Sequence, residues 1–371
     1  MSETARIAVE ETGKVARQDA LETDLGFLWD FWYPAVRSND VYGRKLTKAT
    51  LLEIPLVVGR SSDGRVFALR DACPHRGIPL SFGRFDGQNV QCSYHGWEFD
   101  ACSGRCVAIP SLTSADKLKV ERISAGHFPC EERDGYVWVY VNAPGTQLPD
   151  SVPSVPELPK FGDRFKVTHL ACDLPSHVDQ GIIGLMDPAH GPFVHQSWFW
   201  RSKRSIHEKA KQFEPIPDGF RMSKHSPSTN SAPYQLLKRM TGQPVSTTID
   251  FMLPNMRFEE IQSGKFWFSS RATVTPVRRD LCRIDFVAAW NLPLPVWIFR
   301  SFAGVFLRQD QLTMIQQAEG LKHNPRLMLI DDADRPAKWY FALKQNLVES
   351  RRRGSPMVHP LNGPVTLHWR S

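Results

Sequence analysis

Apolar and polar residues alternate over short segments between residues 40 and 143, a pattern that favours strands half-buried in a sheet. In "LEIPLVVGRSSDGRVFALR" the runs LVVGR and RVFALR flank the turn sequence SSDG, which predicts a β-hairpin. A later segment, "GYVWVYVNAPG", is rich in the β-branched and aromatic residues that suit a buried strand. We therefore expect a small all-β domain over residues 40–143. It follows an N-terminal segment, residues 1–39, that contains the aromatic-rich run FLWDFWY.

Five prolines lie between Pro144 and Pro159. Proline removes a backbone donor and stiffens the chain, so this stretch is typical of a connection between domains and not of a helix or strand. The pattern predicts a proline-rich linker over residues 144–163.

Residues 164–371 show a different periodicity. "DLPSHVDQGIIGLMDPAH" predicts a helix with breaks at Pro188 and Pro192. Strand-like runs follow in "STTIDFMLPNMRFEEI", "KFWFSSRATVTPV" and "LCRIDFVAAW". "VWIFRSFAGVFLRQDQLTMIQQAEGL" then has apolar residues at helical spacing, and "RPAKWYFALKQNLVES" predicts a further helix. The whole pattern indicates an α+β chain, all-β in its first half and mixed in its second.

Composition and charge leave this picture of a globular protein unchanged, with 42% hydrophobic residues and a net charge of +7 in 371 residues. No apolar run resembles a signal peptide or approaches the roughly 20 residues that span a bilayer, so we expect a cytoplasmic protein without a membrane partner. The basic runs RSKRSIHEKAK and RRRG lack the interleaved aromatic residues of a strand-binding platform. We therefore expect no nucleic acid, and interpret these runs as solvated surface or as a docking face for an acidic protein.

Seven cysteines are an odd number in a long chain and a poor match to a disulfide framework. Five of them, including Cys102 and Cys106, have no histidine partner at close spacing and are interpreted as buried small side chains or free thiols. The other two, Cys73 and Cys92, stand two and three residues before a histidine.

The sequences "CPHRG" and "CSYHG" place one cysteine and one histidine in each of two glycine-containing loops, with sixteen residues between His75 and Cys92. Cys73, His75, Cys92 and His95 together offer two sulfur and two nitrogen ligands. Zinc accepts such a set in a tetrahedral site. The split of the set over two similar loops instead suits a [2Fe-2S] cluster in which two cysteines hold one iron and two histidines hold the other.

These loops resemble the signature C-x-H-x(15–17)-C-x-x-H of the Rieske family. Respiratory Rieske proteins have an additional disulfide-forming cysteine in each loop, where this chain has Ile78 and Tyr94. The resemblance is therefore to the oxygenase branch of the family. It implies one Rieske [2Fe-2S] cluster held by Cys73, His75, Cys92 and His95.

A second pattern, "MDPAHGPFVH", lies about 95 residues further on and contains Asp187, His190 and His195. On an unbroken helix, side chains five residues apart diverge by about 140°. Pro192 is expected to break the helix, which would let both imidazoles converge. Two histidines and one carboxylate form the facial site of non-haem Fe(II) oxygenases, but H-x4-H alone is a weak signal.

The spacing D-x-x-H-x4-H matches the catalytic iron motif of the Rieske oxygenases. By that resemblance His190 and His195 are ligands of a mononuclear iron. Asp187 is implied to be an acid that hydrogen-bonds His190 and passes electrons from His95 of the partner subunit. The family often has asparagine where this chain has Gly184, so no such side chain can act here.

The third iron ligand is predicted to be Asp310, within the long helix of "FLRQDQLTMIQQAEGL". The alternatives are Asp285 on a predicted strand and a loop cluster that consists of Asp331, Asp332 and Asp334. If Asp310 has no metal-binding role, we expect it to be a solvated carboxylate on the surface of this helix.

Other residues near these motifs carry weaker signals. His177 and Asp179 are interpreted as supporting or structural residues and not as ligands. The aromatic run Trp198, Phe199 and Trp200 could line a substrate pocket, although core packing explains it equally well.

The resemblance implies the fold and activity of a terminal oxygenase (alpha) component: a Rieske domain, a linker and, over residues 164–371, a helix-grip catalytic domain. Such a component takes NAD(P)H-derived electrons from a reductase or ferredoxin and uses O₂ to oxygenate a small aromatic substrate. The length matches the branch that contains homotrimeric dicamba monooxygenase and carbazole dioxygenase. We expect O- or N-dealkylating monooxygenation, with a ring dioxygenase as the alternative and a non-catalytic Rieske electron carrier as the alternative of another class.

Overall fold

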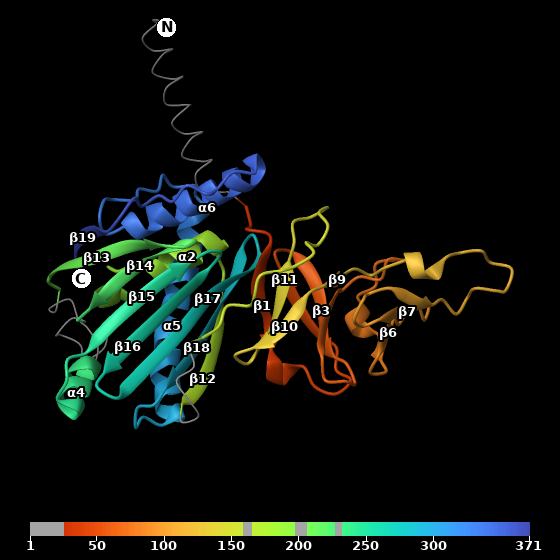
Figure 1. Ribbon diagram of the computed structural model, residues 1–371, viewed down its shortest axis with the longest axis horizontal. Helices are drawn as coiled ribbons and strands as arrows, with labels where there is room; N and C mark the ends of the chain where they lie inside the picture. The colour runs from red at the N-terminus through yellow and green to blue at the C-terminus, as the bar shows by residue number, and fades with distance from the viewer. Residues whose placement is uncertain (1–25, 159–164, 197–205, 227–231) are drawn as a thin grey trace, which may run out of the picture. The chain divides into compact units, whose positions relative to one another are not determined.

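The computed structural model describes residues 26–158, 165–196, 206–226 and 232–371 (Figure 1). The chain divides into two compact units. The β unit contains Trp29–Lys160 and Thr275–Asp285. The mixed unit contains residues 161–274, residues 286–371 and the residues before Trp29.

Three small sheets make up the β unit, with strand orders β1-β11-β10, β2-β3-β4-β9 and β5-β6-β7-β8. The strands are β1 (Phe31–Arg37), β2 (Thr47–Leu51), β3 (Ile54–Arg60), β4 (Val66–Arg70), β5 (Arg84–Phe85), β6 (Asn89–Gln91), β7 (Glu98–Asp100), β8 (Cys106–Ala108), β9 (His127–Phe128), β10 (Cys130–Arg133) and β11 (Tyr136–Val141). Short 3₁₀ turns are η1 (Ser38–Asp40), η2 (Leu80–Phe82) and η3 (Val120–Arg122).

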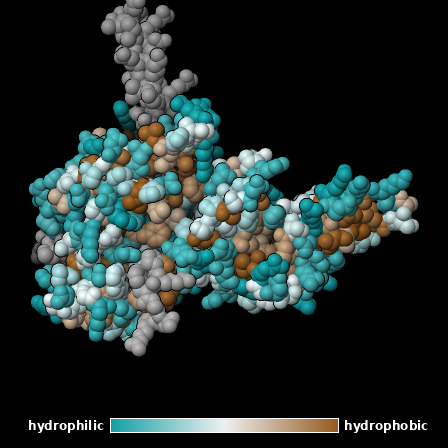
Figure 2. Space-filling model, viewed as in Figure 1, coloured by the Kyte–Doolittle hydropathy of each residue, from teal (hydrophilic) through white to brown (hydrophobic). Residues whose placement is uncertain are grey.

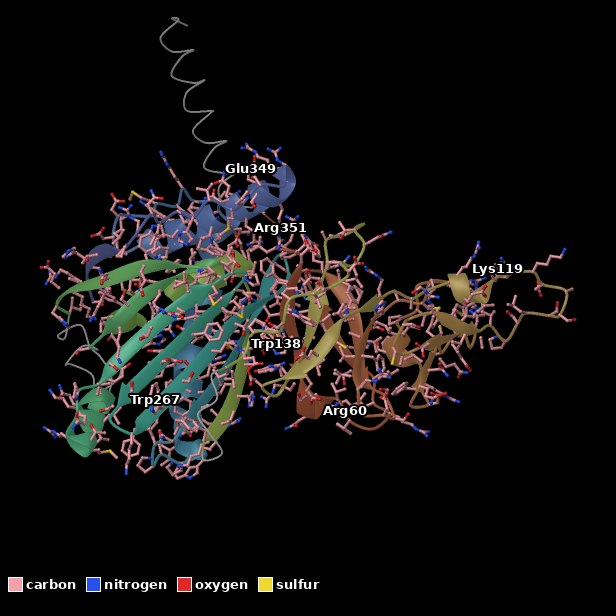
Figure 3. The ribbon with its side chains drawn as sticks, viewed as in Figure 1. Arg60, Lys119, Trp138, Trp267, Glu349 and Arg351 are labelled. Carbon is pink, nitrogen blue, oxygen red and sulfur yellow. The ribbon has the colours of Figure 1, made fainter. Side chains whose placement is uncertain are left out.

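Two predicted elements of this unit are confirmed. β3 and β4 form the expected hairpin, with Arg60 opposite Val66 across the turn. All six residues of β11 are buried, and Trp138 lies within its sheet (Figure 3). β-branched and aromatic side chains fill both faces of this central strand, as the run YVWVYV indicates.

The aromatic-rich run before residue 40 is part of the β unit. Phe31–Arg37 forms β1, which pairs antiparallel with β11 and buries Trp32 and Tyr33. Residues 275–285 also belong to the unit by their bonds, since the Arg283 guanidinium donates to the carbonyl oxygen of Pro34 at 2.7 Å.

The proline-rich stretch packs on the same unit over its described part. The Trp32 indole donates to the carbonyl oxygen of Pro153, and the amide of Leu158 donates to the Asp134 carboxylate. Residues 159–164 of the predicted linker lie outside the described residues, as do residues 1–25 of the predicted N-terminal segment. The domain limits drawn from the sequence remain predictions.

An eight-stranded sheet forms the mixed unit, in the order β12-β18-β17-β16-β15-β14-β13-β19. Its strands are β12 (Lys166–Leu174), β13 (Glu208–Ile216), β14 (Gly219–His225), β15 (Ser246–Met252), β16 (Met256–Ser263), β17 (Phe266–Arg278), β18 (Leu281–Trp290) and β19 (Val365–Arg370). Its helices are α2 (Val178–Met186), α3 (Gly191–Val194), α4 (Ala232–Thr241), α5 (Val296–Leu321) and α6 (Arg335–Arg353). No helix in the described parts of the chain is long and apolar enough to span a membrane.

One face of this sheet, named the inner face below, is covered by both long helices. Successive residues of one strand point to opposite faces of a sheet, whereas residues paired across neighbouring strands point to the same face. Phe220 and its partner Phe251 therefore lie on one face. Trp339 of α6 packs edge-on against Phe220, and Tyr340 packs against Phe251. α6 therefore covers the inner face over β14 and β15.

The same face continues to β17 through the pairs Phe251–Arg257 and Arg257–Ala272. Phe268 is four residues from Ala272 and so points to the inner face as well. The ring of Phe268 lies 5.5 Å from that of Phe299 on α5. α5 and α6 thus share one face of the sheet, and the α+β class expected from the sequence is confirmed.

The face of the molecule shown in Figure 2 is mostly hydrophilic, with apolar patches between polar residues. The basic run that follows Ser350 ends α6, and Figure 3 marks Glu349 and Arg351 there. Arg352 pairs with Glu349 at 2.7 Å, and both are partly exposed. This run is therefore a solvated helix end in which part of the charge is paired. The first residues of the other basic run, 201–205, lie outside the described residues.

Candidate metal centres

Two loops of the β unit have matching backbone geometry. In each, the glycine amide donates back to the cysteine carbonyl: Gly77 to Cys73 at 2.8 Å and Gly96 to Cys92 at 3.1 Å. In each, the cysteine amide donates to the carbonyl oxygen of the residue after the glycine, at 2.8 Å. Both glycines have a positive φ, +74° and +69°, which other residues adopt only with strain. The repeated glycine in the sequence is explained by this turn.

The loops bring their side chains together in like pairs. Cys73 and Cys92 are electrostatic neighbours, and both cysteines are buried. The rings of His75 and His95 lie 4.6 Å apart between centroids. A sulfur pair beside a nitrogen pair fits a two-iron cluster with one iron on each pair better than a single tetrahedral ion.

Electrostatics of the four side chains agree with that fit. Burial, together with the neighbouring Cys92, raises the pKa of the Cys73 thiol to about 11. The thiolates that bind a metal therefore need a cation beside them. Desolvation, with the charges of His75 and Arg76, lowers the pKa of His95 and favours the neutral imidazole that binds a metal.

A second set of ligand atoms lies in the mixed unit. His190, His195 and Asp310 each offer one atom, and these atoms all lie within 4.8 Å of one another. α2 ends at Met186, and the four-residue helix α3 then separates the two histidines. The break at the proline of "HGPFVH" turns the imidazoles toward each other, and their Nε2 atoms are 3.1 Å apart.

The hydrogen bonds of the two rings decide what these Nε2 atoms do. His190 Nδ1 donates to the carbonyl oxygen of Asp187 at 2.9 Å, and His195 Nδ1 donates to the side-chain oxygen of Gln309 at 3.1 Å. A neutral imidazole that donates through Nδ1 has its lone pair on Nε2. Two lone pairs therefore face each other across 3.1 Å, an arrangement that repels unless a cation lies between them.

Asp310 completes the set from α5. Its Oδ1 lies 3.1 Å from Nε2 of His195. Metal–nitrogen bonds of about 2.1 Å at a right angle separate two donor atoms by about 3 Å. The donor set therefore fits three adjacent positions around one ion, which is the facial arrangement of non-haem iron sites.

A Rieske [2Fe-2S] domain model matches residues 31–123, the part of the chain that contains both cysteine–histidine loops. The chain contains a Rieske domain. Its cluster ligands are expected in these Rieske loops.

Several curated relatives of this chain are named oxygenases. The chain is 33% identical over 175 residues to the oxygenase component of dicamba O-demethylase from Stenotrophomonas maltophilia, over 46% of this chain and 48% of that protein. It is 35% identical over 187 residues to chlorophyllide a oxygenase of Chlamydomonas reinhardtii, a match that covers 50% of this chain and 27% of that protein. It is 32% identical over 175 residues to the oxygenase subunit of 3-chlorobenzoate-3,4-dioxygenase from Comamonas testosteroni, over 46% and 38%. The chain thus spans at most about half the length of these relatives.

Solved structures share the fold over most of the chain. Pseudomonas putida CBB5 NdmA with caffeine superposes with a TM-score of 0.72 at 19% identity, over 87% of this chain and 92% of that one. Dicamba monooxygenase bound to dicamba superposes with a TM-score of 0.68 at 21% identity, over 88% and 100%. The resemblance to Rieske oxygenases inferred from the two motifs is confirmed, as is an α+β fold with a Rieske domain.

Asp187 lies beside His190 at the end of α2 and is partly exposed. It ends α2, and its Oδ1 accepts the amide of Ala189 at 2.7 Å. Its Oδ2 lies 3.5 Å from His190 Nδ1, and the side chain is 33% exposed. Burial lowers the pKa of His190, but the hydrogen bond and charge of Asp187 and the charge of Asp310 outweigh it and raise that pKa.

The alternative acids do not join the triad. Asp285 is buried in the β unit and accepts bonds from Arg283 and Thr275. The loop cluster is engaged elsewhere: Asp331 pairs with Lys338, the amide of His368 donates to Asp332, and the amide of Ile330 donates to Asp334.

His177 and Asp179 have structural contacts and do not reach the triad. Asp179 is 1% exposed and accepts two bonds from Lys344 Nζ, at 2.7 and 2.8 Å. The Tyr340 hydroxyl also donates to it, and His177 lies at 3.4 Å. This network joins α2 to α6.

Sequence reasoning missed two residues of the site, Gln309 and Phe306. An amide beside a predicted carboxylate ligand gives no metal-binding signal of its own. Its position next to Asp310 on a predicted helix was the one available signal. The ring of Phe306 lies 4.7 Å from that of His195, and an apolar residue at helical spacing indicates only core packing in the sequence. Trp198, Phe199 and Trp200 lie outside the described residues.

Proposed function

We propose that the chain is the terminal oxygenase component of a multicomponent Rieske system. The observation that carries this proposal is the pairing of two different ligand sets in one chain. Cys73, His75, Cys92 and His95 would hold the [2Fe-2S] cluster, and His190, His195 and Asp310 would hold one mononuclear iron. When bound, the cluster supplies single electrons and the mononuclear iron activates O₂.

The protein side chains orient and connect these groups. Gln309 and the Asp187 carbonyl hold both imidazoles with Nε2 toward the iron position. Asp187 is proposed to pass electrons to the triad from His95 of the partner subunit. A ring of three identical chains would supply that neighbour, because a head-to-tail interface that closes gives a cyclic oligomer. A ferredoxin or reductase would reduce the cluster with electrons from NAD(P)H.

Monooxygenation of a small aromatic compound, with loss of an O- or N-alkyl group, is the proposed reaction. It is supported by similarity to a dicamba O-demethylase and by the fold shared with dicamba monooxygenase. Similarity to a 3-chlorobenzoate-3,4-dioxygenase keeps ring dioxygenation as a second candidate. Product analysis under ¹⁸O₂ across methoxy- and N-alkyl-arenes separates them: one labelled atom per product supports the monooxygenase, and two support the dioxygenase.

Iron content and one substitution test the assignment of the centres. The purified protein should contain about three iron atoms per chain, two in the cluster and one in the triad. Asp310→Ala should lose the mononuclear iron and all oxygenation, while the visible absorption of the cluster stays unchanged. Asp285→Asn is the control and should keep the full iron content. Retained activity in Asp310→Ala would refute the ligand assignment.

The non-catalytic alternative gives a different result in the same measurement. An electron carrier would contain about two iron atoms per chain and consume no O₂ with any arene. A colourless protein with one zinc would contradict both iron proposals.

A further inference from the structure

Charged and polar side chains gather on the inner face of the sheet in the mixed unit. We name them the inner-face cluster: Lys211, His225, Thr247, Arg257 and Glu259. Apolar side chains would be the expected content of a sheet face that two helices cover. The cluster therefore needs an explanation.

Strand register places the members on this face. Thr247 is four residues before Phe251, which packs against Tyr340 of α6, and His225 is opposite Thr247. Glu259 is opposite Ile249, two residues from Thr247. Arg257 is opposite Phe251 itself.

Lys211 belongs to the same face from the neighbouring strand. It stands two residues before Phe213, whose ring packs against Trp339 of α6. The charge of Lys211 lowers the pKa of His225, and that of Glu259 raises it, so these three side chains are electrostatic neighbours. Burial is the largest cause and lowers the pKa of His225, which favours its neutral form.

The charges of the cluster do not balance. Arg257 and Glu259 pair at 3.0 Å, with side chains 21% and 18% exposed. Lys211 is partly buried and donates to the carbonyl oxygen of Ser226 at 2.9 Å. No carboxylate of the described residues lies within ion-pair distance of its ammonium, and burial lowers its pKa. One positive charge is thus left without a counter-charge.

Thr247 adds an independent observation. The residue is 3% exposed, and its hydroxyl has no hydrogen-bond partner among the residues that the structure describes. An unpaired buried hydroxyl costs about 1–3 kcal/mol. A cation without a counter-charge and a hydroxyl without a hydrogen-bond partner, both on one covered face, indicate a missing anionic group.

The iron triad faces the same side of the sheet. Phe299, Phe306 and Asp310 are seven and four residues apart on α5, so they lie along one side of the helix. Phe299 packs on Phe268 of the inner face, and Phe306 packs on His195. α5 therefore presents the triad and two aromatic rings to the face that carries the cluster.

We propose that the inner-face cluster is the recognition end of the substrate site and that the substrate is an aromatic carboxylate. The carboxylate would accept from Lys211 and Thr247, and its ring would lie against the aromatic side chains of α5, toward the triad. The Arg257–Glu259 pair adds no net charge and would line the polar end of the substrate site. This inference rests on the proposed oxygenase function, whose substrate class it narrows.

Calorimetric binding to the iron-loaded protein tests it with a matched pair of probes. 3-Methoxybenzoate and 3-methoxybenzamide differ in the charge of one group. The benzoate should bind at least 10-fold more tightly than the amide. Lys211→Met should remove that preference by weakening the benzoate alone, and Lys211→Arg should retain most of it.

Lys209→Met is the matched control, because Lys209 lies on the same strand and donates instead to the hydroxyl of Ser371 at 2.7 Å. It should leave both affinities unchanged. Equal affinity for the two probes, no binding of either, or an unchanged preference in Lys211→Met would overturn the inference.

Failure of the inference and failure of the proposed function give different results. A protein with a full iron content that oxygenates neutral arenes without preferring the acid refutes only the inference. A protein without mononuclear iron refutes the function, while the two affinities still decide the carboxylate site.

Discussion

At the scale of single residues, the sequence points to the side chains with strong ligand chemistry but not to those that orient them. Thiolate and imidazole pairs at fixed spacing indicate a metal from the sequence, and the structure brings Cys73 to Cys92 and His75 to His95. The amide of Gln309 has no such signal. Its role appears only when the fold places it 3.1 Å from a ring nitrogen of a residue 114 positions away.

Gln309→Leu should weaken iron binding. Without an acceptor for Nδ1, the His195 ring loses the bond that fixes its tautomer, and such losses cost about 10–100-fold in metal affinity. Competition with a chromogenic chelator measures the change. Gln316→Leu, an exposed substitution on the same helix, should have the affinity of the natural chain. Equal affinity in both variants would show that Gln309 does not orient the ligand.

Gly77→Ala should destabilise the first Rieske loop. No atom lies within 4 Å of the added Cβ, so the cost is the backbone strain of φ +74°, about 1–2 kcal/mol. The expected result is faster loss of the cluster absorption during thermal denaturation. An unchanged decay rate would mean that the loop adopts another turn at no cost.

At the scale of elements, periodic segments were predicted well and polar strands were not. The run that begins at Val296 was expected as a long helix and forms α5. β13 was hidden, because "EKAKQFEPI" alternates charges and was interpreted as part of a basic run. Its inward side chains include Lys209 and Lys211, so hydrophobic periodicity gives no strand signal there.

The buried pair that joins α2 to α6 should be essential to stability. Lys344→Met leaves the Asp179 carboxylate buried without a cation, a change that costs about 3–5 kcal/mol. Urea unfolding followed by far-UV circular dichroism measures it. The double variant Asp179→Asn/Lys344→Met should recover most of the loss, and a double variant as unstable as the single one would contradict this explanation.

The same pair predicts how stability depends on pH. Burial raises the pKa of Asp179, but the His177 hydrogen bond and the charge of Lys344 outweigh it, and the net pKa is lowered. A lowered folded-state pKa gives stability that is present above the unfolded value of about 3.9 and is lost as the pH falls below it. The double variant lacks this carboxylate, so its unfolding free energy should change less between pH 5 and pH 3, as urea titrations at each pH would show.

Gly184→Ala should stabilise α2. The position is helical, and the added Cβ would lie 3.6 Å from the methyl group of Met314, an ordinary contact. Replacing an interior helical glycine by alanine gains up to about 1 kcal/mol. A higher midpoint of thermal unfolding with unchanged iron content is the expected result, and a lower midpoint would show that α2 needs the glycine for close packing.

At the scale of the whole molecule, the composition indicates that a β-rich part precedes a mixed part. It does not indicate which residues belong to each compact unit. The proline-rich stretch marks the change from short strands to mixed periodicity. Nothing in the sequence indicates that residues 275–285 belong to the β unit, since their contacts with Leu52, Glu53 and Pro34 join residues more than 200 positions apart. Only the folded chain brings such partners together.

Assembly is the prediction that belongs to this scale. The proposed transfer of electrons through Asp187 from a partner subunit fits a closed ring of three chains, so analytical ultracentrifugation should give about three times the mass of 42.2 kDa. Asp187→Asn should keep that mass and both iron centres but lose most of the rate at which the cluster reduces the triad. A monomer with full turnover would exclude the route.

The hairpin between β17 and β18 has a practical consequence for chimeric enzymes. Its strands begin and end in the mixed unit, while its tip, Thr275–Asp285, is bonded into the β unit. A chimera joined only at the proline-rich stretch would take the first part of the β unit from one parent and the hairpin tip from the other. Such chimeras should therefore have three junctions, one at the proline-rich stretch and one on each side of the hairpin tip. The tip should come from the same parent as Leu52 and Pro34.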